Sequence, residues 1–343
     1  MKAQFPFRLP IIQAPMAGGI TTPELVAAVS NTGALGSLGA GYMAPKDIRS
    51  AIRKIRSLTD KPFNVNLFIT DEQSLNVDVT EVKAILEPIW HELTDAPFDS
   101  NVMYPVSFHE QVEVLLEEKV PIFSFTFGLP SPAIIEQFKK EESLVFGTAT
   151  TPDEADSLEK MGVDAIICQG QEAGGHRGTF SPYDPLYGLF PLLALTREVV
   201  KLPLIAAGGI MTGCAAKAAL VAGAAAVQLG TAFLTTLESG ANMAYKRALL
   251  QMPHRPTVLT NVYTGKSARA IPNSLMEKLE GLNIPLYPIQ HFLTQKLRAL
   301  AADKNRPEFM SLLAGQGYSQ CQSLSAAELI EKLIPFVINK VIN

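Results

Sequence analysis

The chain of 343 residues is predicted to be an α/β protein: a (β/α)8 TIM barrel followed by a smaller, mainly helical C-terminal subdomain. Short apolar runs alternate with helical patterns through the first 240 residues, and eight such runs can be counted. Strands separated by helices pair in parallel, and eight strand–helix units close naturally into a barrel. An open, doubly wound sheet is the competing architecture.

The predicted strands are short and apolar, as is typical of strands that are buried on both faces of a parallel sheet. They cover residues 11–17, 34–38, 63–69, 122–127, 144–148, 163–168, 204–207 and 225–229.

Local signals mark the ends of several intervening helices. A capping hydroxyl and a proline open helices at Thr22-Pro23 and Thr151-Pro152, and Pro45 opens another. Glycines are common just after a helix, because they adopt the left-handed conformation that ends it. The predicted helix ends are Gly33, Gly162 and Gly223.

Two regions interrupt the repeat. Residues 71–107, which include Trp90, are too long for one connection between strands and are interpreted as an insertion near the barrel mouth. After residue 252 the strand–helix alternation stops and helical patterns dominate. We therefore expect a barrel over residues 1–252, carrying the insertion, and a subdomain over residues 253–343 that packs on the barrel.

Composition narrows the class of protein. Hydrophobic residues make up 47% of the chain and charged residues 18%, as in compact folded proteins. The net charge of −4 and the lack of a dense Lys/Arg tract argue against a nucleic-acid partner. The five histidines are scattered and no H-E-x-x-H motif occurs, so no metal site is predicted.

Cysteine usage and the N-terminal sequence bear on localisation. The three cysteines, Cys168, Cys214 and Cys321, form no C-x-x-C pair, which indicates a reducing, cytoplasmic setting. Neither a signal peptide nor a membrane span is expected. A homo-oligomer is compatible with the sequence.

The sequence Gln171-Glu172-Ala173-Gly174-Gly175-His176-Arg177-Gly178 follows the sixth predicted strand. Its glycines let backbone N–H groups approach a bound molecule closely, and His176 has an ordinary pKa near neutrality. Barrel enzymes place their active sites at the carboxyl ends of the strands. This position favours a functional loop over a plain turn.

Other strand ends carry further signals. Gly208 and Gly209 follow the seventh strand, and Gly230 follows the eighth, each shortly before a predicted helix. This pair of exits predicts a phosphate site. The first strand leaves through a run of small residues at 14–19, against which a planar ligand can lie. In the third strand, Asn64 and Asn66 share one face, and for each a structural tie and a binding role stay open.

The ordered set of these motifs resembles the nitronate monooxygenases over nearly the whole chain. The matching segments are residues 13–19, 22–25, 36–42, 66–68, 171–178, 206–210, 228–231 and 314–317.

The resemblance implies an FMN-dependent barrel enzyme that oxidises alkyl nitronates, such as propionate 3-nitronate, with O2 to a carbonyl compound and nitrite. It implies that His176 binds the nitronate oxygens as a hydrogen-bond donor, and acts as a base if a neutral nitroalkane is used. The residues expected to bind FMN are Met16, Asn66, Gln169, Gly174, Gly208, Gly209, Gln228, Leu229, Gly230 and Thr231.

Two other functions remain as alternatives: a flavin-dependent enoyl-acyl-carrier-protein reductase that uses NAD(P)H, and a flavin-binding protein without turnover. Arg177 is expected to pair either with an anionic substrate or with a local carboxylate. Four further residues that could line the pocket mouth are expected on the surface: Tyr104, Lys266, Arg269 and Tyr287.

Overall fold

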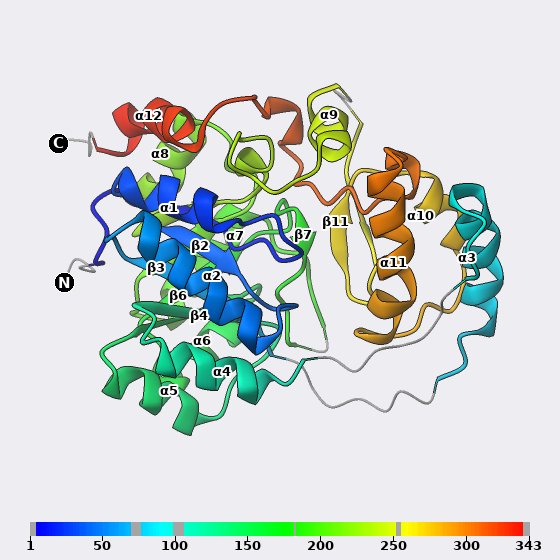
Figure 1. The fold of residues 1–343 in the computed structure, drawn as a ribbon. Helices are drawn as coiled ribbons and strands as arrows, with labels where there is room; N and C mark the ends of the chain where they lie inside the picture. The colour runs from blue at the N-terminus through cyan, green and yellow to red at the C-terminus, as the bar shows by residue number, and fades with distance from the viewer. Residues whose placement is uncertain (1–4, 70–76, 99–105, 182, 252–254, 339–343) are drawn as a thin grey trace.

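The fold is the predicted (β/α)8 barrel. The computed structural model describes residues 5–69, 77–98, 106–181, 183–251 and 255–338. Eight parallel strands form one sheet in the order β1-β9-β8-β6-β5-β4-β3-β2. A parallel bridge between Ile12 and Leu35 joins the two ends of this order, so the sheet closes on itself. Helices surround it (Figure 1).

Each of the eight predicted strands is present. The first is shorter than predicted and ends before Pro15, whose ring nitrogen has no hydrogen to donate to a neighbouring strand. The barrel strands are β1 (Ile11–Gln13), β2 (Gly36–Gly39), β3 (Phe63–Phe68), β4 (Ile122–Thr126), β5 (Leu144–Ala149), β6 (Ala165–Gln169), β8 (Leu204–Ala207) and β9 (Ala226–Leu229).

The predicted helix boundaries are confirmed where a cap was identified. The hydroxyls of Thr22 and Thr151 accept hydrogen bonds from the first turns of their helices, and Gly162 ends the second of these helices at φ 86°. No helix in the described part of the chain is long and apolar enough to cross a membrane. The barrel helices are α1 (Pro23–Asn31), α2 (Pro45–Leu58), α4 (Phe108–Glu117), α5 (Pro132–Lys140), α6 (Pro152–Met161), α7 (Leu189–Val199) and α8 (Gly213–Val221).

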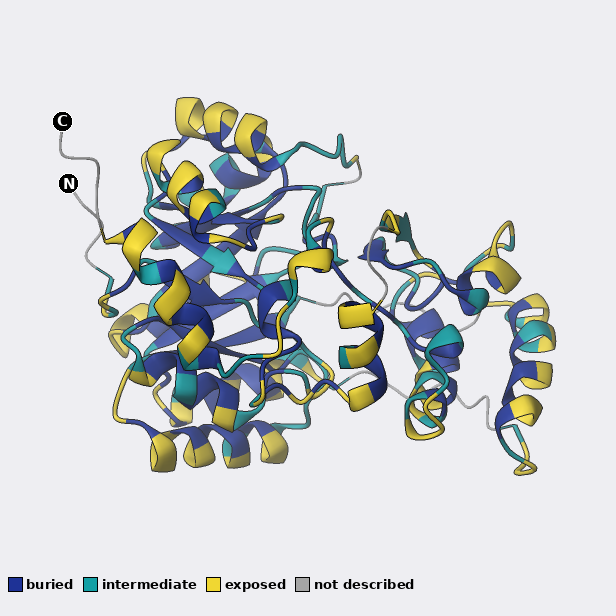
Figure 2. Ribbon diagram, turned by 90° about the horizontal axis from the view of Figure 1, so that it is seen from above, coloured by how far each residue is buried: buried dark blue, intermediate teal, exposed yellow. Residues whose placement is uncertain are grey.

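A second, smaller unit has its own apolar core beside the barrel mouth (Figure 2). It brings together α3 (Thr80–Leu93), α9 (Met243–Gln251), α10 (Ser274–Leu279) and α11 (Ile289–Asp303). It also contains two short antiparallel strands, β10 (Val258–Thr260) and β11 (Ala268–Ala270), which were not predicted. Strands of three residues are too short to show an alternating pattern in the sequence.

Two elements lie away from the units to which the sequence assigned them. Helix α3, from the predicted barrel insertion, packs against α11 of the smaller unit. Helix α12 (Ala326–Val337), from the predicted subdomain, packs against α8 and α1 of the barrel (Figure 1). Its apolar face joins the barrel core through Leu329, Ile330 and Leu333. The exact limits of the two domains stay a prediction.

The two units also share a sheet. The loop after β6 contains a short strand, β7 (Gly175–His176), which pairs antiparallel with β11. His176 lies opposite Ala268 in this pairing. The histidine of the barrel loop is therefore held by backbone hydrogen bonds to the smaller unit.

Candidate functional site

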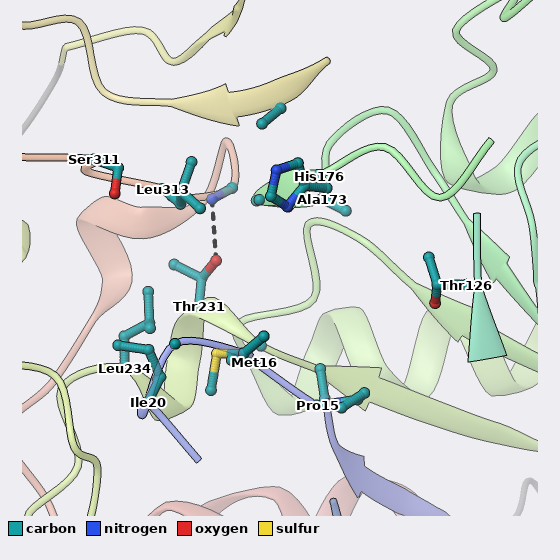
Figure 3. Close-up of a pocket in the computed structure, with 18 of the residues that line it drawn as sticks. Pro15, Met16, Ile20, Thr126, Ala173, His176, Thr231, Leu234, Ser311 and Leu313 are labelled. Carbon is teal, nitrogen blue, oxygen red and sulfur yellow. Dashed lines mark hydrogen bonds between the residues drawn. The ribbon is translucent and has the colours of Figure 1, made fainter. Parts of the chain in front are cut away.

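A cavity of about 470 Å³ lies at the carboxyl ends of the barrel strands, between the barrel and the smaller unit. In Figure 3, Met16 and Thr231 reach it from the barrel, while Ser311 and Leu313 border it from the segment after α11. Its size is typical of a site for a cofactor or small molecule. All eleven predicted site residues border it: Met16, Asn66, Gln169, Gly174, His176, Gly208, Gly209, Gln228, Leu229, Gly230 and Thr231.

The ends of β8 and β9 form a cradle of glycines and backbone N–H groups. Gly208 and Gly209 have φ of 121° and 67°, in the region that favours glycine. Within the described residues, the N–H groups of Gly209, Gly230 and Thr231 have no hydrogen-bond partner in the protein. Such convergent donors are suited to hold an anion.

Gln228 contributes an unsatisfied acceptor to the same wall. Its Oε1 is buried and has no partner among the described residues. A buried polar atom without a partner is costly, so it indicates a ligand donor at this point.

The imidazole of His176 borders the cavity and is neutral near pH 7. Its Nε2 lies 2.8 Å from the hydroxyl oxygen of Thr264. Desolvation, followed by the charges of Lys266 and Arg298, lowers the pKa of His176 to about 3. The ring can therefore donate through one nitrogen and accept through the other, but it does not carry a charge.

The side chain of Gln169 fastens the histidine loop to the end of β6. Its Nε2 donates to the carbonyl of His176 over 3.0 Å, and its Oε1 accepts from the N–H of Gly178 over 2.8 Å. The amide of Gln169 is thus used within the protein, although the residue borders the cavity. It sets the position of the histidine backbone.

Arg177 is fully buried and pairs with a local carboxylate, which resolves the alternative left open by the sequence. Its Nε and Nη2 donate to the two carboxylate oxygens of Asp184 over 2.8 and 3.1 Å. Its Nη1 donates to the carbonyls of Gln169 and Gly170, both over 3.0 Å. The guanidinium holds the loop in place and does not border the cavity.

The buried carboxylate of Glu154, at the start of α6, holds the chain after the histidine loop. One oxygen accepts from the hydroxyl of Thr179 and from the N–H groups of Phe180 and Ser181, over 2.7 to 2.8 Å. The other accepts from the N–H and hydroxyl of Thr150. Five hydrogen-bond donors and, among the described residues, no cation contact this carboxylate, so the loop is fixed at both of its ends.

Gly174 is needed for a close backbone approach. A Cβ at this position would lie 2.4 Å from the nitrogen of Gly315, in the late glycine segment 314–317. The N–H of Gly315 donates to the hydroxyl of Thr231 over 3.0 Å (Figure 3). The histidine loop, the end of β9 and the late segment therefore meet at one point.

Comparison with known proteins identifies this arrangement. The family model described as nitronate monooxygenase matches residues 2–335. The chain belongs to the nitronate monooxygenase family. It is therefore an oxidoreductase.

This member of the nitronate monooxygenase family is similar to individual proteins over nearly its whole length. A probable nitronate monooxygenase from Staphylococcus haemolyticus is 42% identical, over 95% of this chain and 93% of the relative. The structure of nitroalkane oxidase from Streptomyces ansochromogenes has 40% identity and a TM-score of 0.91, covering 97% and 96% of the two chains. FabK from Thermotoga maritima has 30% identity and a TM-score of 0.76, covering 97% and 93%.

The surface position predicted for Arg269 is wrong, whereas Lys266 and Tyr287 are only partly buried; none of the three borders the cavity. Arg269 is buried and donates through Nε to the carbonyl of Gln171 over 2.7 Å. Lys266 is half-buried, with its Nζ 4.6 Å from the ring centre of Phe127. The half-buried Tyr287 ring centre lies 6.5 Å from that of His176. Tyr104 lies outside the described residues.

The paired amides of β3 have a clear structural role. Asn64 and Asn66 both donate through Nδ2 to the hydroxyl of Ser124, over 2.9 and 3.0 Å. Asn66 also borders the cavity, whereas Asn64 does not. Asn64 is thus a tie between strands, and Asn66 combines this tie with a place in the cavity wall.

Sequence reasoning missed the polar wall that α11 contributes. His291, Gln295 and Arg298 border the cavity, and the imidazole of His291 stacks on Tyr42 with ring centres 4.3 Å apart. Their spacing of four and three residues puts them on one face of a helix, which was the available signal. In the described wall of the cavity there is no aspartate or glutamate.

Proposed function

We propose that this chain oxidises alkyl nitronates, such as propionate 3-nitronate, with O2 to a carbonyl compound and nitrite, using FMN. The observation that carries the proposal is one cavity that combines the neutral imidazole of His176 with the glycine cradle at the ends of β8 and β9. The first supplies a hydrogen-bonding group for substrate, and the second supplies donors for a phosphate.

The residues present fit FMN. Free N–H groups at Gly209, Gly230 and Thr231 suit the phosphate, and the orphan Oε1 of Gln228 suits a donor on the flavin. When bound, FMN would supply the transfer of electrons from the nitronate to O2. Met16, Asn66, Gly174, Gly208 and Leu229 complete the proposed contact set, while Gln169 would act chiefly by holding the loop.

The role of His176 depends on which ring nitrogen carries the proton. Where the Thr264 hydroxyl donates to Nε2, the proton is on Nδ1, which can then donate to a nitronate oxygen. Where Nε2 donates to Thr264, Nδ1 is left as an acceptor and can take a proton from a neutral nitroalkane. Among the described residues Nδ1 has no hydrogen-bond partner, so both roles are compatible with the protein.

The purified protein provides the test. We expect a yellow protein with an FMN spectrum, rapid O2 uptake with propionate 3-nitronate or ethylnitronate, and negligible NAD(P)H oxidation. Reduction of a crotonyl thioester by NADH, without nitronate turnover, would instead assign an enoyl reductase. Flavin binding with neither activity would assign a binding protein.

We also infer a reducing, cytoplasmic setting. Cys168, Cys214 and Cys321 are unpaired with one another, which supports this inference.

A further inference from the structure

A cationic side chain on the far side of the cavity has no counter-ion among the described residues. Arg298, on α11, borders the cavity close to Ser311, which Figure 3 places on the wall opposite the barrel. No carboxylate of the described chain forms an ion pair with it. Arg298 is half-buried, and a partly desolvated charge without an opposite charge is unfavourable, so the site favours an anionic ligand.

The hydrogen bonds of Arg298 use neutral acceptors. Its Nε donates to the hydroxyl of Thr294 over 3.0 Å, and its Nη1 to the hydroxyl of Ser311 over 3.1 Å. Its Nη2 reaches Nδ1 and the carbonyl of His291 only at 3.4 Å. These bonds fix the guanidinium in one orientation, and one N–H on Nη1 is left for a ligand.

The surroundings strengthen the positive potential. Burial, followed by the charge of Arg298, lowers the pKa of His291 to about 2, so its ring is neutral and adds no charge to this wall. Burial raises the pKa of the nearby phenols of Tyr42 and Tyr263, so both are protonated and uncharged at neutral pH. The cationic wall therefore has no anion of its own.

Arg298 is linked to His176 through the side chains of Tyr287 and His291. Ring centres are 6.5 Å apart from His176 to Tyr287 and 6.3 Å apart from Tyr287 to His291, which adjoins Arg298. Both Arg298 and His176 border the same cavity, and the charge of Arg298 acts on the imidazole of His176, so one small ligand can contact both side chains.

We propose that Arg298 is a specificity-determining residue that binds a second anionic group, a carboxylate, at the end of the substrate distant from the nitronate carbon. This inference rests on the proposed function. The carboxylate would accept hydrogen bonds from the guanidinium while His176 binds the nitronate end. Nitronates with an uncharged alkyl end would lack this contact.

Two substrates that differ only at this end test the proposal. Propionate 3-nitronate carries a carboxylate where propyl-1-nitronate carries a methyl group. We expect Arg298→Met to lower kcat/KM for propionate 3-nitronate by roughly 10- to 100-fold, mainly through KM, because hydrogen bonds to charged groups are among the stronger ones. The variant should change kcat/KM for propyl-1-nitronate little, and Arg298→Lys should restore part of the difference.

The matched control is Lys304→Met, which removes an exposed positive charge at the end of the same helix and should alter neither substrate. Equal losses for both substrates in Arg298→Met, or loss of the flavin, would overturn the proposal. The wild-type protein gives a measurement that does not depend on folding of a variant. Calorimetry should show tighter binding of 3-nitropropionate than of 1-nitropropane, and equal affinities would contradict a carboxylate site.

Turnover of the two nitronates and binding of the two nitro compounds separate this inference from the proposed function. Absence of turnover with either nitronate would reject the proposed function, while preferential binding of 3-nitropropionate would still support Arg298 as a carboxylate site.

Discussion

The imidazole of His176 borders the cavity, where desolvation and the charges of Lys266 and Arg298 lower its pKa. These surroundings keep it neutral over the whole physiological pH range. A neutral ring near the reacting end can donate or accept a proton, and Thr264 can satisfy either choice.

Replacement of this ring tests its role directly. In His176→Ala we expect nitronate turnover to fall roughly 100- to 10,000-fold, as is usual when a group that transfers a proton or hydrogen bond is removed. Flavin content should largely persist, because the glycine cradle is on other strands. Steady-state O2 uptake and the absorbance of released flavin measure the two quantities, and unchanged turnover would remove His176 from the mechanism.

The lowered pKa of His176 also predicts a dependence of stability on pH. The unfolded imidazole titrates near its ordinary pKa of about 6.5, whereas the folded one titrates at about 3. Between these values the unfolded chain binds more protons, so the free energy of unfolding falls as pH drops, and this contribution is complete only above about 6.5.

Chemical denaturation at two pH values measures this effect. From pH 7 to pH 5, we expect His176→Gln to lose less stability than the wild type, by on the order of 1 kcal/mol. Equal losses of unfolding free energy in the two proteins would contradict a lowered pKa of His176 in the folded state.

At the scale of elements, the histidine loop is fixed by contacts from four directions. Gln169 and Arg177 hold it to the barrel, Glu154 holds the chain after it, and β11 pairs with β7. The late segment 314–317 covers it from the other side at Gly174.

Substitutions at two neighbouring glycines test whether the close backbone contact between the histidine loop and the late segment shapes the cavity. Gly174→Ala puts a methyl group 2.4 Å from the nitrogen of Gly315, so it should displace the late segment, loosen flavin binding and lower turnover. Gly175→Ala is the matched control. It meets no atom within 4 Å, although its φ of 76° costs about 1 to 2 kcal/mol.

Thermal unfolding and flavin affinity measured on both variants separate these effects. Similar flavin affinity in the two variants would show that the contact at Gly174 does not shape the cavity.

The sequence predicted the elements with strong local signals and missed those that depend on distant partners. The eight barrel strands and the caps at Thr22 and Thr151 follow from apolar runs and local hydrogen bonds. Strand β7 exists only through its pairing with the distant β11, and β10 and β11 pair over three residues each, too few to show in the sequence. The same limit applies to the site: His176 has a motif, whereas Arg298 becomes part of the cavity only through the packing of α11.

At the scale of the molecule, the cavity is bordered by two apolar cores. The barrel core and the core of the smaller unit both contact Met16, which also borders the cavity. A ligand in this cavity thus touches both units and should make their unfolding more cooperative.

Calorimetry with and without cofactor measures this coupling. We expect FMN at 100 times its dissociation constant to add about 2.7 kcal/mol to the free energy of unfolding, and to merge separate transitions into one. Riboflavin at the same concentration should stabilise less, because it lacks the phosphate that the glycine cradle would hold. Equal stabilisation by the two flavins would count against a phosphate site at Gly209, Gly230 and Thr231.

The pairing of β7 with β11 has a consequence for protein engineering. His176 and Ala268 are paired in one antiparallel sheet although 92 positions in sequence separate them. The two chain segments therefore depend on each other structurally. A chimera of two relatives that divides the parents between these segments would combine strands that have not been selected together. Crossover points for recombination of such enzymes should therefore keep residues 175–178 and 267–270 from the same parent.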